Sequence, residues 1–160
     1  MNLTLLSKDD AMDLYDFELK NRAYFEQSVP GRGDDYFVIE NFVRVLDGLL
    51  SEQETGTCYF HLIKDDAGEI IGRLNLVDIV NGTAHVGYRI AESFAGKGIA
   101  SKALQLLLAC AKERYHVHQL LAKTTIDNLS SQRVLEKNGF QLTCVLEEDA
   151  VTFKHYSIDL

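Results

Sequence analysis

The stretch Ser93-Phe94-Ala95-Gly96-Lys97-Gly98-Ile99-Ala100-Ser101 decides how the second half of this chain folds. An apolar run over residues 84–90 comes before it and predicts a strand, and a run over 99–115 follows it with apolar residues at helical spacing. A glycine-rich turn from a strand into a helix can hold phosphate, because glycine lets the backbone approach closely and the first helical N–H groups have no partner within the helix. The sequence therefore predicts a phosphate-binding loop.

Two other phosphate-binding motifs do not fit these residues. The loop of nucleoside triphosphatases needs a Gly-Lys-Ser/Thr after a four-residue spacer, and none is present. The dinucleotide fingerprint Gly-x-Gly-x-x-Gly needs glycine at position 101, where the chain has Ser101. A Rossmann-type fold is also disfavoured by the antiparallel strands expected ahead of the loop. What remains is a short pyrophosphate cradle made of backbone N–H groups.

The rest of the chain predicts a mixed sheet covered by helices. Asn81-Gly82 is a strong hairpin signal between strands expected at 69–79 and 83–90, with another strand expected at 57–64. The strand expected at 119–126 follows a helix, so it should run parallel to strand 83–90. Further strands are expected at 2–6, 140–146 and 150–158, the last two joined by a turn at 147–149, and helices at 7–23, 34–52, 99–115 and after Asn128. The apolar stripe of the first helix is expected to run through Met12 and Leu19, and Asn128 or Ser130 is expected to cap the last helix. We expect an α/β (α+β) fold with a mixed, mostly antiparallel sheet of six to seven strands, as a single domain over residues 1–160.

The composition of the chain limits the classes of partner and the compartment that can be expected. The net charge of −8 disfavours nonspecific nucleic-acid binding, no apolar run approaches the ~20 residues of a membrane span, and the N-terminal residues lack the pattern of a signal peptide. Cys58, Cys110 and Cys144 imply neither a disulfide framework nor a metal site, and each is expected to be a small core residue. We therefore expect a cytoplasmic monomer or homodimer with no metal, nucleic acid or membrane partner.

A second motif follows the loop. The chain reads Asn128-x-x-Ser131-x-Arg133-Val134-Leu135-Glu136-Lys137-x-Gly139-Phe140. Together with Gly96-x-Gly98, it makes the chain similar to the GNAT superfamily of acyl-CoA-dependent N-acyltransferases, whose pyrophosphate motif reads Gln/Arg-x-x-Gly-x-Gly/Ala. The second motif resembles the branch that acetylates ribosomal-protein N-termini. Arg22, Tyr24-Phe25 and residues 86–90 are also in that branch's style, so the resemblance spans essentially the whole chain.

The resemblance implies acetyl-CoA as co-substrate and direct transfer of its acetyl group to a primary amine in a ternary complex. The backbone of Tyr88, Arg89 and Ile90 would pair with the pantetheine arm as an added strand, and Asn128 would reach the arm or the acyl end. A gap between the two parallel strands would let the thioester reach the acceptor. The diphosphate would be held by Ala95, Gly96, Lys97, Gly98, Ile99, Ala100 and Ser101.

The sequence departs from the family pattern in ways that bear on catalysis. Ser93 replaces Gln or Arg, which matters little because the backbone does the holding. Leu135 stands where many members carry the tyrosine that protonates the departing thiolate, and Ser131 is the substitute that the branch implies. His85 stands where the branch often has a glutamate, and a histidine can serve as general base near neutral pH. Thr143-Cys144 replaces Glu-Gly after Gly-Phe, so that acidic candidate is lost.

Ordinary structural roles also explain these residues. Ser131 is also explained as a first-turn hydroxyl that bonds the backbone, and His85 as an ordinary strand side chain. Cys144 as a nucleophile is disfavoured because no base partner accompanies it. Two function classes stay open: an N-acetyltransferase acting on a peptide N-terminus or on a small polyamine-like or aminoglycoside-like amine, and a non-catalytic acyl-CoA sensor.

Overall fold

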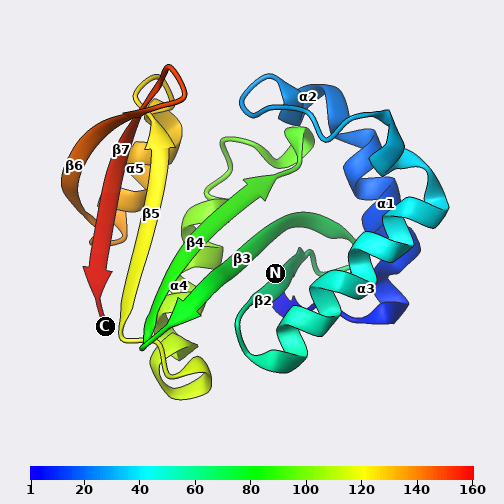
Figure 1. The fold of residues 1–160 in the computed structure, drawn as a ribbon, viewed down its shortest axis with the longest axis horizontal. Coiled ribbons are helices and arrows are strands. Elements are labelled where there is room, and N and C mark those ends of the chain that lie inside the picture. Colours follow the sequence, from blue (N-terminus) through cyan, green and yellow to red (C-terminus); the bar gives the residue numbers. More distant parts are fainter.

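The computed structural model describes all 160 residues, and its seven strands form one sheet in the order β1-β2-β3-β4-β5-β7-β6 (Figure 1). Neighbouring strands are antiparallel except β4 and β5, which run parallel. This confirms the expected mixed, mostly antiparallel sheet. The strands are β1 (Asn2–Leu5), β2 (Tyr59–Lys64), β3 (Ile70–Val80), β4 (Thr83–Ile90), β5 (Gln119–Thr125), β6 (Gln141–Glu148) and β7 (Val151–Asp159).

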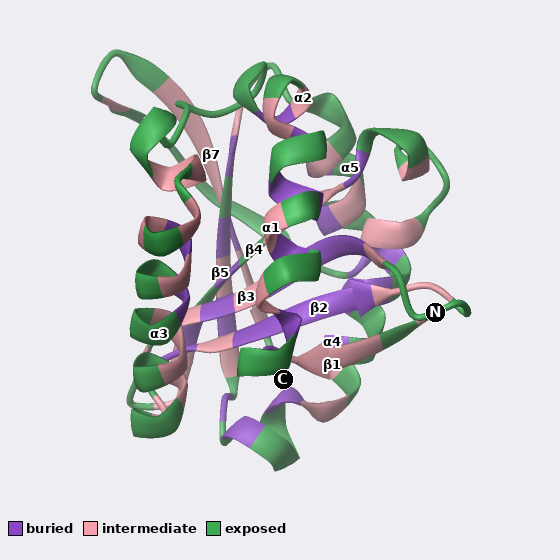
Figure 2. Ribbon diagram, turned by 90° about the vertical axis from the view of Figure 1, so that its right-hand side faces the viewer, coloured by how far each residue is buried: buried purple, intermediate pink, exposed green.

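Helices cover both faces of the sheet. One face carries α1 (Ala11–Lys20), α2 (Arg22–Glu26) and α3 (Ile39–Thr55), and the other carries α4 (Ile99–Tyr115) and α5 (Leu129–Lys137). Each face has its own apolar core, so the sheet is sandwiched between two packed layers. Figure 2 shows buried residues concentrated in the central strands, while the outward sides of α1 and α3 are exposed.

Local sequence signals explain several boundaries. Asn81 (φ 50°) and Gly82 (φ 77°) both adopt left-handed backbone conformations, as a tight two-residue hairpin requires. Ser7 and Asp10 form a reciprocal capping box where the chain enters the first helical turns. No helix is both long and apolar enough to cross a lipid bilayer.

The first helical segment differs from the sequence prediction. A single helix over 7–23 was expected to bury Met12 and Leu19, but these side chains are 54% and 46% exposed. The buried face instead carries Leu14 and Phe17. The helix breaks at Asn21, whose amide group donates to the Phe17 carbonyl and accepts from the backbone of the η3 turn (Glu92–Phe94). This contact joins residues that are 71 positions apart in the sequence, so no local pattern reveals it, and it ends the helix early.

Other differences are smaller. The helix expected from residue 34 begins as the 3-10 turn η2 (Asp34–Phe37), and α3 follows only after the extended residue Val38. Cys58 is buried as expected, but Cys144 is exposed because β6 is an edge strand. The turn expected at 147–149 is instead formed by Asp149 and Ala150, both with positive φ.

The parallel strands β4 and β5 pair over only a short stretch, and their separation makes room for the site. Pairing between β4 and β5 covers only Thr83–His85 against Gln119–Leu121. Beyond these residues the two strands diverge toward their carboxyl ends (Figure 1). The edge of β4 that faces β5 is therefore without a strand partner over residues 86–90. This is the expected place for a ligand in a sheet of this kind.

Candidate active site

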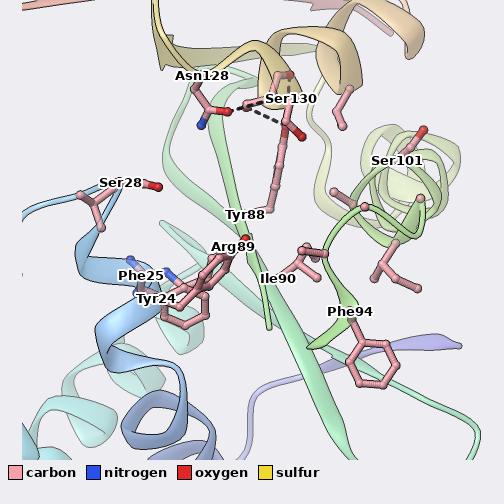
Figure 3. Close-up of a pocket in the computed structure, with 18 residues that line it drawn as sticks. Tyr24, Phe25, Ser28, Tyr88, Arg89, Ile90, Phe94, Ser101, Asn128 and Ser130 are labelled. Atoms are coloured by element: carbon pink, nitrogen blue, oxygen red, sulfur yellow. Dashed lines mark hydrogen bonds between the residues drawn. The ribbon is translucent and has the colours of Figure 1, made fainter. Parts of the chain in front are cut away.

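A cavity of about 320 Å³ lies where β4 and β5 diverge. It is bounded by α2, the end of β4, the loop into α4 and the start of α5 (Figure 3). Its volume lies within the range of small-molecule sites. The sequence-predicted residues that line it are Tyr88, Arg89, Ile90, Ala95, Gly96, Gly98, Ile99, Ala100, Ser101, Asn128 and Ser131. Lys97 and His85 do not line it: Lys97 is exposed over the Phe94 ring, and His85 is exposed on β4.

The loop before α4 presents a row of free donors. The backbone N–H groups from Gly96 to Ser101 have no hydrogen-bond partner within the protein, and the first amide that bonds back is that of Lys102, to the Gly98 carbonyl at 3.1 Å. Gly96 (φ 72°) and Gly98 (φ 75°) adopt conformations that favour glycine. A Cβ atom at either position would meet nothing within 4 Å, so the space above the amides is open. Free amides at the positive end of a helix fit a diphosphate group.

The side chain of Ser101 has a separate task. Its hydroxyl accepts a hydrogen bond from Asn138 Nδ2 at 3.0 Å in a buried position. Asn138 also bonds the Val134 carbonyl, at 2.7 Å, so it fixes the end of α5 to the start of α4. Ser101 therefore offers its backbone to the cavity, and its hydroxyl holds the two helices in place.

Asn128 begins α5 and faces the cavity at the same time. Its Oδ1 accepts from the Ser131 amide at 3.1 Å, which confirms the predicted helix cap. The side-chain nitrogen of Asn128, Nδ2, has no partner within the protein and is free to donate to a ligand.

A hydrogen bond across the cavity joins β4 to α5. The Tyr88 hydroxyl oxygen lies 2.9 Å from Ser131 Oγ and 3.4 Å from the Ser131 carbonyl oxygen (Figure 3). Burial raises the pKa of Tyr88, so this phenol keeps its proton at neutral pH. Leu135, at the family's tyrosine position, is buried in the core. The hydroxyl of Tyr88 escaped sequence reasoning, which used only the backbone of this residue.

The two faces of β4 serve different sides of the molecule. Tyr88 points toward α5, whereas the Arg89 guanidinium lies 4.7 Å above the ring of Phe25 in α2 (Figure 3). The cavity wall formed by α2 and the residues just after it, with Tyr24, Phe25, Ser28 and Val29, was not assigned from the sequence. The pattern Arg22, Tyr24-Phe25 was the only sequence signal for this wall. It could not place the wall at the cavity, because α2 comes beside β4 only in the folded chain. No group of three or more His, Cys, Asp or Glu side chains could hold a metal ion.

Comparison with known proteins gives this geometry its context. The model of the acetyltransferase (GNAT) domain matches residues 1–141. The chain belongs to the GNAT acetyltransferase family. As a GNAT member it is an acetyl-CoA-dependent N-acetyltransferase, which confirms the fold and the class of activity predicted from the two motifs.

Individual relatives agree with this assignment. The GNAT chain is 32% identical to the probable N-acetyltransferase YjcK of Bacillus subtilis (strain 168) over 139 residues, 84% of this chain and 77% of that protein. It is 28% identical to the [ribosomal protein uS5]-alanine N-acetyltransferase of Escherichia coli (strain K12) over 142 residues, 86% and 73% of the two chains. A structure of RimL, a ribosomal L7/L12 alpha-N-protein acetyltransferase in complex with coenzyme A, superposes with a TM-score of 0.88 at 26% identity and covers 99% of this chain and 93% of RimL.

Proposed function

We propose that this enzyme acetylates a primary amine by direct attack in a ternary complex, and that a protein or peptide N-terminus is the first class of acceptor to test. One observation carries the mechanism: the free amides of Gly96–Ser101 and the Tyr88–Ser131 hydroxyl pair open onto the same cavity. The acceptor class is supported by the similarity to the uS5-alanine N-acetyltransferase. A small amine is the second class of acceptor.

The protein offers matching groups for each part of acetyl-CoA, which supplies an acyl group activated as a thioester. The amides from Gly96 to Ser101 would hold the diphosphate, with the exposed Lys97 ammonium beside them. The unpaired edge of β4 at Tyr88–Ile90 can accept an extended arm as an added strand. The free side-chain nitrogen of Asn128, Nδ2, would donate to the arm or to its acyl end.

The transfer requires two proton movements. An alkylamine has a pKa of about 10 and must lose a proton before it attacks. His85, exposed on the face of β4 that Arg89 shares, is the proposed general base. The C–N bond forms, the C–S bond breaks, and the departing thiolate takes a proton from Ser131, which the Tyr88 hydroxyl orients and can reprotonate. Holding both reactants in register supplies a further part of the rate.

The alternative of a non-catalytic acyl-CoA sensor is less well supported. The absence of the family tyrosine at Leu135 and of the glutamates would favour it, but the Tyr88–Ser131 pair provides a hydroxyl that can act in place of the tyrosine, and His85 is the proposed base in place of a glutamate. The ribosome-modifying relative also supports a cytoplasmic location. The oligomeric state, monomer or homodimer, stays a prediction.

A thiol-release assay tests the proposal directly. The enzyme is incubated with acetyl-CoA and a panel of peptides and small amines, while calorimetry measures acetyl-CoA binding separately. We expect turnover with at least one class of amine. Measurable acetyl-CoA binding without turnover on any amine would favour the sensor and overturn the proposal.

A further inference from the structure

The acceptor side of the site is built around an excess of arginine. β-strand alternation places His85, Gly87 and Arg89 on one face of β4, opposite to Tyr88 and Ile90. Tyr88 binds Ser131 on the α5 side, whereas Arg89 reaches α1 and α2 on the other side of the sheet. The Arg89 side chain therefore lies on the α2 side of the cavity, opposite to the Tyr88–Ser131 pair, and this is the side from which an acceptor would approach.

One buried carboxylate meets three guanidinium groups on this face. Glu18, only 2% exposed, lies 2.6 Å from Arg73, 3.5 Å from Arg89 and 3.8 Å from Arg32. Arg73 is buried and makes the shortest contact, and its Nε has no partner. The cluster thus has three cations for one anion, and it is short of acceptor oxygens. Buried or half-buried charge without compensation is costly, so an anion from outside would stabilise this arrangement.

The neighbouring charges do not remove the excess. Arg22 is the next cation along, and it is already paired with Glu26 at 3.0 Å and Asp34 at 2.7 Å. Asp34 is almost fully exposed, so its influence on the inner cluster is screened by solvent. The net charge of −8 is spread over the whole protein, and charges more than a Debye length of about 10 Å away are largely screened by salt, so it does not cancel a local contact.

Arg89 and Arg32 have donors to spare. Their side chains are 27% and 35% exposed, so solvent and ligands can reach them. Arg32 bonds the Tyr36 hydroxyl, and Arg89 makes a single hydrogen bond to Glu18. Each guanidinium carries five N–H donors in a planar fork that matches a carboxylate or a phosphate.

The face of β4 between Arg89 and the proposed base, His85, is unobstructed. Gly87 lies midway between His85 and Arg89 on the same face, and a Cβ atom at Gly87 would meet nothing within 4 Å. Asn75 pairs with Gly87 across the strands, and its Oδ1 is buried without a hydrogen-bond partner. An unpaired buried acceptor beside empty space suits an N–H group of a ligand. From His85 to Arg89 the strand spans roughly 13 Å, at ~3.3 Å per residue.

We propose that the acceptor carries an anionic group, a carboxylate or a phosphate, within roughly 13 Å of its reacting amine, and that Arg89 and Arg32 bind this group. The inference rests on the proposed acetyl transfer and names the acceptor class for it. An extended peptide advances ~3.3 Å per residue, so an acidic side chain among the residues just after the N-terminus fits the span. A small amine that carries a carboxylate or a phosphate fits it as well.

Matched acceptors test the inference. Peptide amides with an N-terminal alanine followed by two aspartates, two asparagines or two lysines are compared by kcat/KM in the thiol-release assay. Free aspartate and phosphoethanolamine are assayed beside them. We expect the aspartate peptide to exceed the asparagine peptide by about tenfold or more, the size of a charge-assisted hydrogen bond. Efficient turnover of the free amines instead would assign the same subsite to a small acceptor.

Arginine variants show whether the preference arises at this cluster. Arg89→Gln and Arg32→Gln should each reduce the ratio between the two peptides to about twofold to threefold, mainly through KM, while the acetyl-CoA affinity is unchanged. Arg22→Gln is the matched control, because two carboxylates already offset its charge. Arg32→Gln also guards against misfolding, because Arg32 is the most exposed of the three cluster arginines and makes the longest contact with Glu18.

The outcomes separate this inference from the proposed function. Turnover of the aspartate, asparagine and lysine peptides at equal rates, or a preference for lysine, would overturn the anion subsite and leave the acetyl transfer standing. A preference for aspartate that survives in both Arg89→Gln and Arg32→Gln would also overturn it. No turnover on any amine would instead count against the proposed function.

Discussion

Tyr88 and Ser131 connect β4 with the start of α5 across the gap between the parallel strands, with their hydroxyl oxygens 2.9 Å apart. This hydrogen bond lies at the same cavity as Asn128 and the free amides of residues 96–101, which would hold acetyl-CoA. It links a residue of the predicted cofactor strand to the residue predicted to protonate the leaving group. The pair acts as a unit in the proposed mechanism, which makes the effects of its variants predictable.

Removal of either hydroxyl should slow the chemical step. We expect Ser131→Ala to lower kcat by roughly 100-fold, at the lower end of what general acid catalysis contributes. Tyr88→Phe should lower it by a smaller factor, because Ser131 remains but is no longer oriented. The double variant should be little worse than Ser131→Ala, since coupled residues are not additive. Steady-state kinetics measure these effects, and calorimetry should show nearly unchanged acetyl-CoA affinity. Fully multiplicative losses would show that the two hydroxyls act independently.

The amide cradle predicts a charge-dependent loss of binding at Gly98. Gly98→Asp places a carboxylate beside the proposed diphosphate site, in a left-handed conformation that Asp and Asn both tolerate. Gly98→Asn has the same shape without the charge and serves as the control. Calorimetry should show acetyl-CoA affinity reduced by a factor of ten or more in Gly98→Asp relative to Gly98→Asn, about 1.4 kcal/mol or more. Equal affinities for the two variants would mean that the loop does not face the diphosphate.

Because the face of β4 is unobstructed at Gly87, a larger side chain there should weaken acceptor binding selectively. An added side chain has room there, and the backbone conformation of Gly87 is not restricted to glycine. Gly87→Val should therefore fold normally but fill the acceptor path, and raise the acceptor KM by about tenfold with little change in acetyl-CoA affinity. Gly48→Ala, at an exposed position within α3, is a control that should leave kinetics unchanged and stabilise the helix by up to about 1 kcal/mol. An unaltered acceptor KM in Gly87→Val would place the acceptor elsewhere.

The parts of the fold that depend on local chemistry were predictable from the sequence. Residues that tolerate positive φ predict both the hairpin at Asn81-Gly82 and the glycine loop at 93–101. The parallel pairing of β4 with β5 followed from the intervening helix alone. The residues proposed to bind the cofactor could be named from the sequence for the same reason, because backbone amides at a helix start need no distant partner.

The proposed acceptor side could not be predicted from the sequence, because it depends on tertiary contacts. Glu18 reads as a surface residue in a helix, yet it is buried because arginines from β3, β4 and the segment after α2 converge on it. The expected apolar stripe through Met12 and Leu19 failed for the same reason, since the true buried face includes this charged position. The Tyr88 hydroxyl was missed because its partner Ser131 is 43 residues away in the chain.

A buried histidine predicts how stability depends on pH. Burial lowers the pKa of His61 from 6.5 to about 4. Its Nδ1 donates to the Leu74 carbonyl at 3.1 Å, so Nε2 accepts from the Tyr115 hydroxyl at 2.7 Å and the ring is neutral. The unfolded chain takes up a proton near pH 6.5, but the folded chain does so only near pH 4. Stability should therefore fall as the pH drops through this window, by on the order of 3 kcal/mol at most.

Urea denaturation between pH 7 and pH 5 measures this dependence. His61→Gln should be less stable at pH 7, because it disturbs the buried hydrogen bonds, but its free energy of unfolding should change less with pH. Other titrating groups are common to both proteins and cancel in the comparison. Parallel pH profiles for the two proteins would show that His61 is not the group responsible.

A crystal structure of this chain with coenzyme A tests the central claim most directly. The account predicts the diphosphate within hydrogen-bond distance of the amides of residues 96–101, and the pantetheine arm along the free edge of β4 with its sulfur near Ser131. A coenzyme bound elsewhere, with those amides still facing solvent, would contradict it.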